Sequence, residues 1–119
     1  MEHSNEFLTL VADSASHVRE ISVDDAAVRI SAGAILIDVR EDNEFHAGHA
    51  ANAKHLGRGV IERDIVQTVP SKETELILYC GGGFRSALAA DNLQKMGYSN
   101  VWSMAGGWKA WVEGGKDVE

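Results

Sequence analysis

Three consecutive glycines at residues 81–83 place the strongest constraint on how this chain can fold. The apolar residues 76–79 precede them and the helix-favouring segment 87–96 follows, a pattern that predicts a buried strand, a tight loop and a helix. Cys80, the only cysteine, begins the loop and Arg85 ends it. Backbone amides at the start of a helix favour negative charge. A thiolate at Cys80 would therefore be stabilised as a nucleophile.

A packing role for Cys80 is the competing interpretation, because a lone cysteine after an apolar strand is commonly an inert core residue. Three adjacent glycines suit positive φ angles or a close approach to a ligand. A packing cysteine needs neither these glycines nor an arginine at the far end of the loop. The surrounding residues therefore favour a reactive thiol.

The composition is that of one globular domain, with 119 residues of which 45% are hydrophobic. A formal net charge of −7 argues against nucleic acid or an anionic membrane as a partner, since both need a basic face. One cysteine excludes an internal disulfide. There is no signal segment and no run of about 18 apolar residues, so we expect a cytoplasmic protein.

Apolar periodicity and turn residues predict strands that alternate with helices. We expect strands at residues 19–21, 34–40, 53–56, 76–79 and 98–103. We expect helices at 6–18, 23–30 with Ser22 as N-cap, 41–47, 60–69 and 87–96, and a turn with a short helix within 105–111. This alternation favours an α/β fold, a central parallel sheet with helices on both faces. The apolar stripe on helix 6–18 could dock on the domain or on a partner subunit, and docking on the domain is expected.

Two residue pairs invite functional interpretations but are better explained by structure. Asp38 and Arg40 lie at the carboxyl end of a predicted strand, where sites of α/β proteins gather, yet a structural ion pair is favoured there over catalysis. Trp108 and Trp111 share one face of a short helix, which favours core packing over an aromatic cofactor box.

Three histidines, His46, His49 and His55, lie close together in the sequence. Cysteine and acidic ligands are not gathered around them at zinc-like spacing, so no metal site is predicted, and His49 is expected to cap a turn. We likewise expect no cofactor.

The glycine loop could belong to three chemistries. Its Gly81-x-Gly83-x-x-Ser86 pattern lacks the third glycine and the acidic residue of a dinucleotide site, and the Lys of a P-loop is absent. A cysteine phosphatase also uses a cysteine, an amide cradle and an arginine. Four residues separate Cys80 from Arg85. So tight a ring suits one extra atom on the cysteine sulfur better than a tetrahedral phosphate.

Five segments together resemble the single-domain rhodaneses, which are sulfurtransferases of the rhodanese superfamily. They are Asp38-Val-Arg-Glu41, Glu44-Phe-His-Ala-Gly-His49, Gly57-Arg-Gly-Val-Ile-Glu62, Tyr79-Cys-Gly-Gly-Gly-Phe-Arg-Ser86 and Ala105-Gly-Gly-Trp-Lys-Ala-Trp111. The resemblance implies a rhodanese-like three-layer domain over residues 19–115, preceded by a helical extension over 1–18.

The resemblance also implies roles for the loop. Cys80 would form a persulfide, and Arg85 would shape the loop and attract anionic donors. Asp38 and Arg40 match a framework motif, and Arg58 is placed near the pocket mouth. Phosphatase relatives have a loop one residue longer than the six residues found here. The backbone amides expected to cradle the sulfur belong to Gly81, Gly82, Gly83, Phe84, Arg85 and Ser86.

The implied function is transfer of a sulfane sulfur from an anionic donor, thiosulfate or polysulfide, to a thiophilic acceptor. With no second cysteine to resolve a persulfide, the acceptor must be external: cyanide, a thiol or a protein. One alternative is a carrier or protein-binding module that holds sulfur without turnover, and another is a phosphatase or arsenate reductase. The chain is expected to be a monomer or a homodimer.

Overall fold

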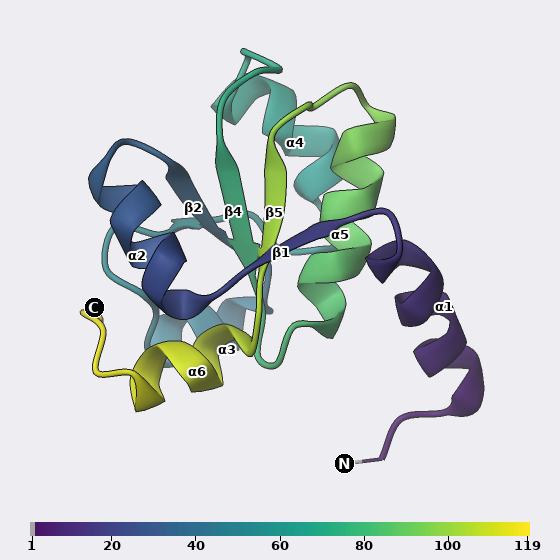
Figure 1. Cartoon of the computed structure of the whole chain (residues 1–119), viewed down its shortest axis with the longest axis horizontal. Helices are drawn as coiled ribbons and strands as arrows, with labels where there is room; N and C mark the ends of the chain where they lie inside the picture. Colours follow the sequence, from purple (N-terminus) through teal and green to yellow (C-terminus); the bar gives the residue numbers. More distant parts are fainter. Residues whose placement is uncertain (1) are drawn as a thin grey trace.

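The computed structural model describes residues 2–119 and contains a five-stranded parallel sheet with helices on both faces (Figure 1). This confirms the predicted fold class. The strand order is β1-β5-β4-β2-β3, so β4 lies at the centre and β1 at one edge. The strands are β1 (Arg19–Ile21), β2 (Ile35–Asp38), β3 (Lys54–His55), β4 (Leu76–Tyr79) and β5 (Val101–Met104).

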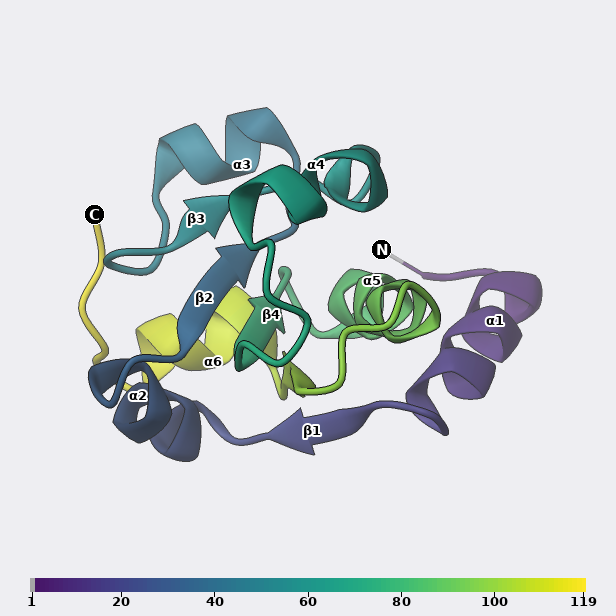
Figure 2. The same ribbon diagram turned by 90° about the horizontal axis from the view of Figure 1, so that it is seen from above.

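The helices form one layer on each side of this sheet (Figure 2). On one face lie α2 (Val23–Ser31) and α6 (Gly107–Glu113), and on the other lie α4 (Ile61–Thr68) and α5 (Phe84–Lys95). The short α3 (Asp42–Ala47) follows the carboxyl end of β2, and α1 (Asn5–Ala15) packs against α5. No helix within residues 2–119 has the length and apolar character needed to cross a membrane.

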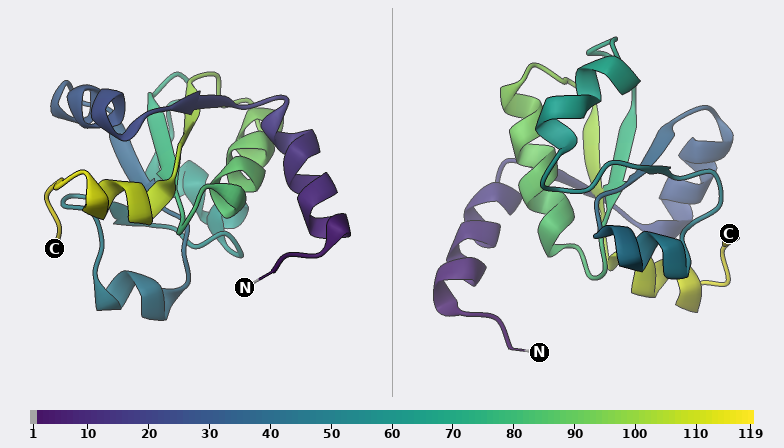
Figure 3. Two further views of the ribbon diagram at one scale, coloured as in Figure 1. Left: turned by 60° about the horizontal axis from the view of Figure 1, so that its bottom comes forward. Right: turned by 180° about the vertical axis from the view of Figure 1, so that it is seen from behind.

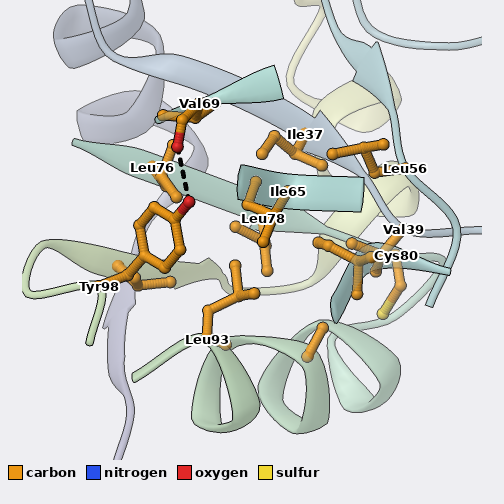
Figure 4. Close-up of a cluster of buried hydrophobic side chains, with 14 residues drawn as sticks. Ile37, Val39, Leu56, Ile65, Val69, Leu76, Leu78, Cys80, Leu93 and Tyr98 are labelled. Carbon is orange, nitrogen blue, oxygen red and sulfur yellow. Dashed lines mark hydrogen bonds between the residues drawn. The ribbon is translucent and has the colours of Figure 1, made fainter. Parts of the chain in front are cut away.

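Side-chain alternation along β4 divides the core in two. Leu76, Leu78 and Cys80 point into the cluster beneath α4 and α5, which Figure 4 shows, whereas Ile77 and Tyr79 point toward α2 and α6. All five side chains are at most 1% exposed. A central strand buried on both faces is therefore continuously apolar, as the sequence indicated.

Several boundaries differ from the sequence-based expectations. The first helix ends at Ala15 and not at Val18. The last strand begins at Val101, because Tyr98 instead closes the end of α5: its amide donates to Leu93 O at 3.1 Å and its hydroxyl to Val69 O at 2.6 Å (Figure 4). The predicted N-cap is confirmed, since the hydroxyl of Ser22 accepts from the amide of Asp25 at 3.1 Å.

The predicted docking of the first helix is confirmed, and its site is α5 (Figure 3). Val11 and Ser14 are buried in this contact. Just beyond the helix, Gln94 donates to the backbone oxygen of His17 at 2.8 Å. These contacts fix the carboxyl end of α1, while its amino end extends toward the glycine loop that begins at Cys80.

Asp38 and Arg40 form the structural ion pair that the sequence predicted. Arg40 Nη2 donates to Asp38 Oδ2 at 2.8 Å and to the oxygen of Gly48 at 2.6 Å. The hydroxyl of Tyr79 donates to the same carboxylate at 2.6 Å and accepts from Ala50 N at 3.0 Å. Burial, and next the hydrogen bond to Asp38, raises the pKa of Tyr79, which keeps the hydroxyl a donor.

The two tryptophans also pack as expected. Trp111 is 5% exposed within the cluster formed with α2, and Trp108 packs against the same cluster beneath the Arg40 guanidinium.

We predict that Asp38→Asn lowers the free energy of unfolding by about 3–5 kcal/mol, because it leaves a buried guanidinium without its counter-charge. Urea unfolding followed by tryptophan fluorescence measures this loss. The matched control is Asp64→Asn, which makes the same chemical change in an exposed pair with Arg63 on α4. Equal losses in the two variants would contradict a framework role for Asp38.

Candidate active site

Cys80 follows directly after β4, where the central strand meets the glycine loop. Its sulfur accepts hydrogen bonds from two backbone amides, Gly83 N at 3.1 Å and Ser86 N at 3.3 Å. The residue is free and only 1% exposed. Both amides lie at the start of α5, whose dipole adds to their effect. The loop therefore directs positive potential at a single sulfur atom.

The backbone of this loop is shaped by glycine at one position in particular. Gly83 is the N-cap of α5 and has φ of +111°, a left-handed conformation that side chains disfavour. A Cβ at Gly82 would meet nothing within 4 Å. The three glycines are therefore not equivalent: one is required by its dihedral angle, whereas its neighbour lies in open space.

The start of α6 holds the loop from the other side. Trp108 N donates to Cys80 O at 2.7 Å, and Lys109 N donates to Gly81 O at 3.3 Å. A Cβ on Gly107 would overlap the carbonyl oxygen of Cys80, so glycine permits this approach. The sequence predicted a tight turn here. The contact could not be predicted, because it joins segments more than 20 residues apart in a manner that only the folded sheet defines.

Two buried serines support the sulfur. Ser86 Oγ lies 3.6 Å from Cys80 Sγ, 2.8 Å from Ser103 Oγ and 3.2 Å from the oxygen of Gly83. Ser103 comes from β5, beside the central strand. The Ser86 hydroxyl donates its proton to the oxygen of Gly83, and its oxygen accepts from the Cys80 thiol. Sequence analysis missed Ser103, because an isolated serine in a strand carries no motif.

Arg85 is held by Glu44, an acidic residue on α3 for which the sequence predicted no role. Its Nη1 and Nη2 donate to the two oxygens of Glu44, at 2.7 and 3.1 Å. This bidentate hydrogen bond lowers the pKa of Glu44 to about 2 and raises that of Arg85. The positive charge beside Cys80 is therefore both fixed in place and partly offset.

A cavity of about 250 Å³ opens over the sulfur. Cys80, Gly82, Phe84 and Arg85 line it from the loop and the start of α5, and His3 and Phe7 line it from the N-terminal segment. Of the predicted loop residues, Gly81, Gly83 and Ser86 do not line this cavity. The sequence did not indicate that this segment reaches the loop. Arg58, expected near the pocket mouth, does not line this cavity, and its amide donates to Val39 O at 3.0 Å.

The three neighbouring histidines have local roles. His49 stacks on Phe45 with ring centroids 3.7 Å apart, and its Nδ1 contacts the oxygen of Phe45 at 2.9 Å in the last turn of α3, which confirms the predicted cap. His55 stacks on the same ring and contacts Arg40 O at 2.8 Å. Among residues 2–119, no group of three or more His, Cys, Asp or Glu residues is arranged to hold a metal ion.

Comparison with known proteins agrees with this geometry. Residues 22–114 match the family described as the rhodanese-like domain. The chain belongs to this family. The match spans every element from α2 to α6, including the loop after β4 and the turn at Gly107 that holds it.

Relatives of this rhodanese-like chain include named sulfurtransferases. A putative mitochondrial thiosulfate sulfurtransferase of Schizosaccharomyces pombe is 35% identical over 90 residues, which cover 66% of this chain and 63% of that protein. The chain thus spans less than two thirds of the yeast protein's length. Thiosulfate sulfurtransferase GlpE of Tolumonas auensis is 31% identical over 97 residues, which cover 81% of this chain and 90% of that protein.

One solved structure matches this chain over its first helix as well. A Rhodopseudomonas palustris protein of unknown function, described as a possible tyrosine phosphatase, superposes with a TM-score of 0.84 at 25% identity. The superposition covers 100% of this rhodanese-like chain and 98% of the other. The likeness therefore extends beyond the family match to include α1.

We predict that Gly83→Ala costs about 1 kcal/mol or more in stability, because alanine is strained at a positive φ. It should also slow alkylation of Cys80, since the strain displaces an amide that contacts the sulfur. Gly82→Ala is the matched control, and we expect little change in either property. Urea unfolding and the rate of iodoacetamide labelling measure both effects. Equal behaviour of the two variants would contradict this account of the loop.

The ion pair between Glu44 and Arg85 is expected to stabilise the protein in a pH-dependent way. Glu44→Gln should reduce the free energy of unfolding at pH 7 by about 1 kcal/mol, a modest value because each side chain of the pair is nearly one third exposed. The pKa of Glu44 is lowered from 4.5 to about 2, so the stabilisation is complete above about pH 4.5 and is lost as the pH falls toward 2. Unfolding of both proteins across this pH range measures the difference.

The control for that experiment is Glu75→Gln, which breaks a similar pair with Arg29 far from the loop. Only Glu44→Gln should also raise the labelling rate of Cys80 by anionic iodoacetate relative to neutral iodoacetamide, because it removes the negative charge beside Arg85. A stability difference that grows on acidification would contradict the assigned pairing.

Proposed function

We propose that this protein is a sulfurtransferase that moves a sulfane sulfur from an anionic donor, thiosulfate or polysulfide, to a thiophilic acceptor through a persulfide on Cys80. The observation that carries the proposal is the pair of amide hydrogen bonds, from Gly83 and Ser86, to the sulfur of Cys80. They lie in a loop of six residues from cysteine to arginine. The names of the yeast and GlpE relatives support the same reaction class.

In the first step, the Cys80 thiolate attacks the outer sulfur of thiosulfate. A new S–S bond forms, the old S–S bond breaks, and its electron pair leaves with sulfite. The sulfite carries two negative charges, so positive potential at the mouth lowers the barrier. Arg85 and the start of α5 supply that potential.

The loop then holds the persulfide. The backbone amides of residues 81–86 form the cradle for the outer sulfur, and Gly83 N and Ser86 N already point to the sulfur that it joins. The Ser86 hydroxyl, held beside Ser103, lies 3.6 Å from the same sulfur. Hydrogen bonds from preorganised donors require no rearrangement during the reaction.

The second step requires an external acceptor, because Cys80 is the only cysteine. Cyanide, a small thiol or a protein thiol attacks the outer sulfur and restores the thiolate. Separation of the two steps by a covalent intermediate leads us to expect ping-pong kinetics. In this proposal the reaction belongs to the domain of residues 19–115, with residues 1–18 as a helical extension.

The test is the intact mass of the protein after incubation with thiosulfate, and separately with polysulfide. We expect wild type to gain the mass of one sulfur atom, and cyanide to remove it with release of thiocyanate. Cys80→Ser keeps the size of the side chain and should gain nothing. Failure of wild type to gain sulfur from either donor, while iodoacetamide still labels Cys80, would contradict the proposal.

Turnover separates an enzyme from a carrier. With excess thiosulfate and cyanide, we expect thiocyanate to exceed the protein many times over, whereas a carrier would stop at one equivalent. The same preparation should not hydrolyse p-nitrophenyl phosphate, because the six-residue loop is too tight for a phosphate. Phosphatase activity that is lost in Cys80→Ser would overturn the argument from loop size.

A further inference from the structure

Three aromatic rings, two from the N-terminal segment and one from the start of α5, meet over the cavity that opens onto Cys80. The ring centroids of His3 and Phe7 are 5.1 Å apart, those of His3 and Phe84 are 5.1 Å apart, and those of Phe7 and Phe84 are 6.1 Å apart. Phe84 opens α5, Phe7 lies in the first turns of α1, and His3 precedes that helix. We refer to these three residues as the aromatic wall.

We propose that this wall makes the site selective for an organic sulfur donor, in which a flat apolar body carries the sulfane sulfur, over inorganic thiosulfate. This inference rests on the proposed function and names its substrate class. Phe84 remains 39% exposed, and Phe7 is partly exposed, although both are large apolar side chains. Aromatic faces left accessible beside a reactive sulfur offer a surface on which a ring can stack.

The size of the cavity fits such a molecule. Pockets that enclose drug-sized ligands measure about 300–1,000 Å³. The cavity here is about 250 Å³ and is lined by both Cys80 and the aromatic wall. A single ring with its sulfur group is smaller than a drug molecule, so it can contact the wall while its outer sulfur reaches Cys80.

The charges around the cavity also favour an organic donor over thiosulfate. Among the described residues that line it, Arg85 alone carries a permanent positive charge. Glu44 accepts two hydrogen bonds from the Arg85 guanidinium and partly offsets its charge. The whole chain has a formal net charge of −7. A monoanion therefore suits this site better than the thiosulfate dianion.

The reaction balances for an aryl thiosulfonate, a monoanion of this class. The Cys80 thiolate attacks its terminal sulfur, an S–S bond forms, and the S–S bond to the sulfonyl group breaks. The electron pair leaves with the aryl sulfinate, and the cysteine keeps one extra sulfur as a persulfide anion. No oxidant, reductant or proton is required, and each side of the reaction carries two negative charges.

The experiment compares three donors with the same reacting sulfur: benzenethiosulfonate, methanethiosulfonate and thiosulfate. The initial rate of persulfide formation on the full chain is followed by intact mass, so the result does not depend on turnover. An aromatic contact contributes roughly two- to tenfold. We expect Phe7→Ala to reduce the rate with benzenethiosulfonate by that factor relative to both other donors, because only this donor has a ring.

Two further variants keep the test decisive. Phe7→Leu retains an apolar side chain that can hold α1 in place, and we expect it to lower the same ratio. Leu10→Ala removes an exposed apolar side chain elsewhere on α1 and should leave the ratio unchanged. Equal losses with all three donors would show that Phe7 only supports the loop and would overturn the inference.

Failure of the inference can be told apart from failure of the proposed function. If thiosulfate loads Cys80 while the donor ratio is the same in wild type, Phe7→Ala and Phe7→Leu, the wall does not select donors and the sulfurtransferase proposal remains. If none of the three donors loads a Cys80 that is still alkylated, the proposed function and the inference are both wrong.

Discussion

The buried carboxylate of Asp38 connects two central strands of this domain. It accepts from the side chain of Arg40 and from the hydroxyl of Tyr79, and so connects the ends of β2 and β4. Arg40 extends the connection to the backbone of Gly48. Because Tyr79 directly precedes Cys80, the network fixes the exit of the central strand from which the loop begins. The position of the proposed nucleophile thus depends on a buried polar group that does not contact it.

Beyond the end of β4, the site is formed mainly by main-chain groups. Amides at the start of α5 converge on the sulfur, and the amide of Trp108 restrains the carbonyl of Cys80 from the opposite helix layer. Side chains contribute at the periphery, where Arg85 and Glu44 set the charge. Helices from both layers, α5 and α6, therefore contact Cys80. Folding of the sheet brings these helices together and so also assembles the site.

Sequence alone predicted the fold well, because its strands are short apolar runs separated by helices with clear stops. It also predicted the loop from Cys80 to Arg85, since nucleophile, glycines and arginine are contiguous. The partners supplied by distant segments were missed. Ser103 and Glu44 are ordinary residues in a strand and a short helix, and nothing local indicates that the sheet brings them to the loop. The reach of Phe7 to the cavity depends on how α1 docks, which periodicity does not determine.

A main-chain cradle has a consequence for how such a domain can diverge. The amides that contact the sulfur are present whatever side chains surround them, provided that Gly83 keeps its left-handed turn. Residues around the rim can therefore be replaced without dismantling the reactive centre. Gene duplication can therefore yield paralogues that keep the same main-chain hydrogen bonds to the cysteine and differ in the molecules they recognise.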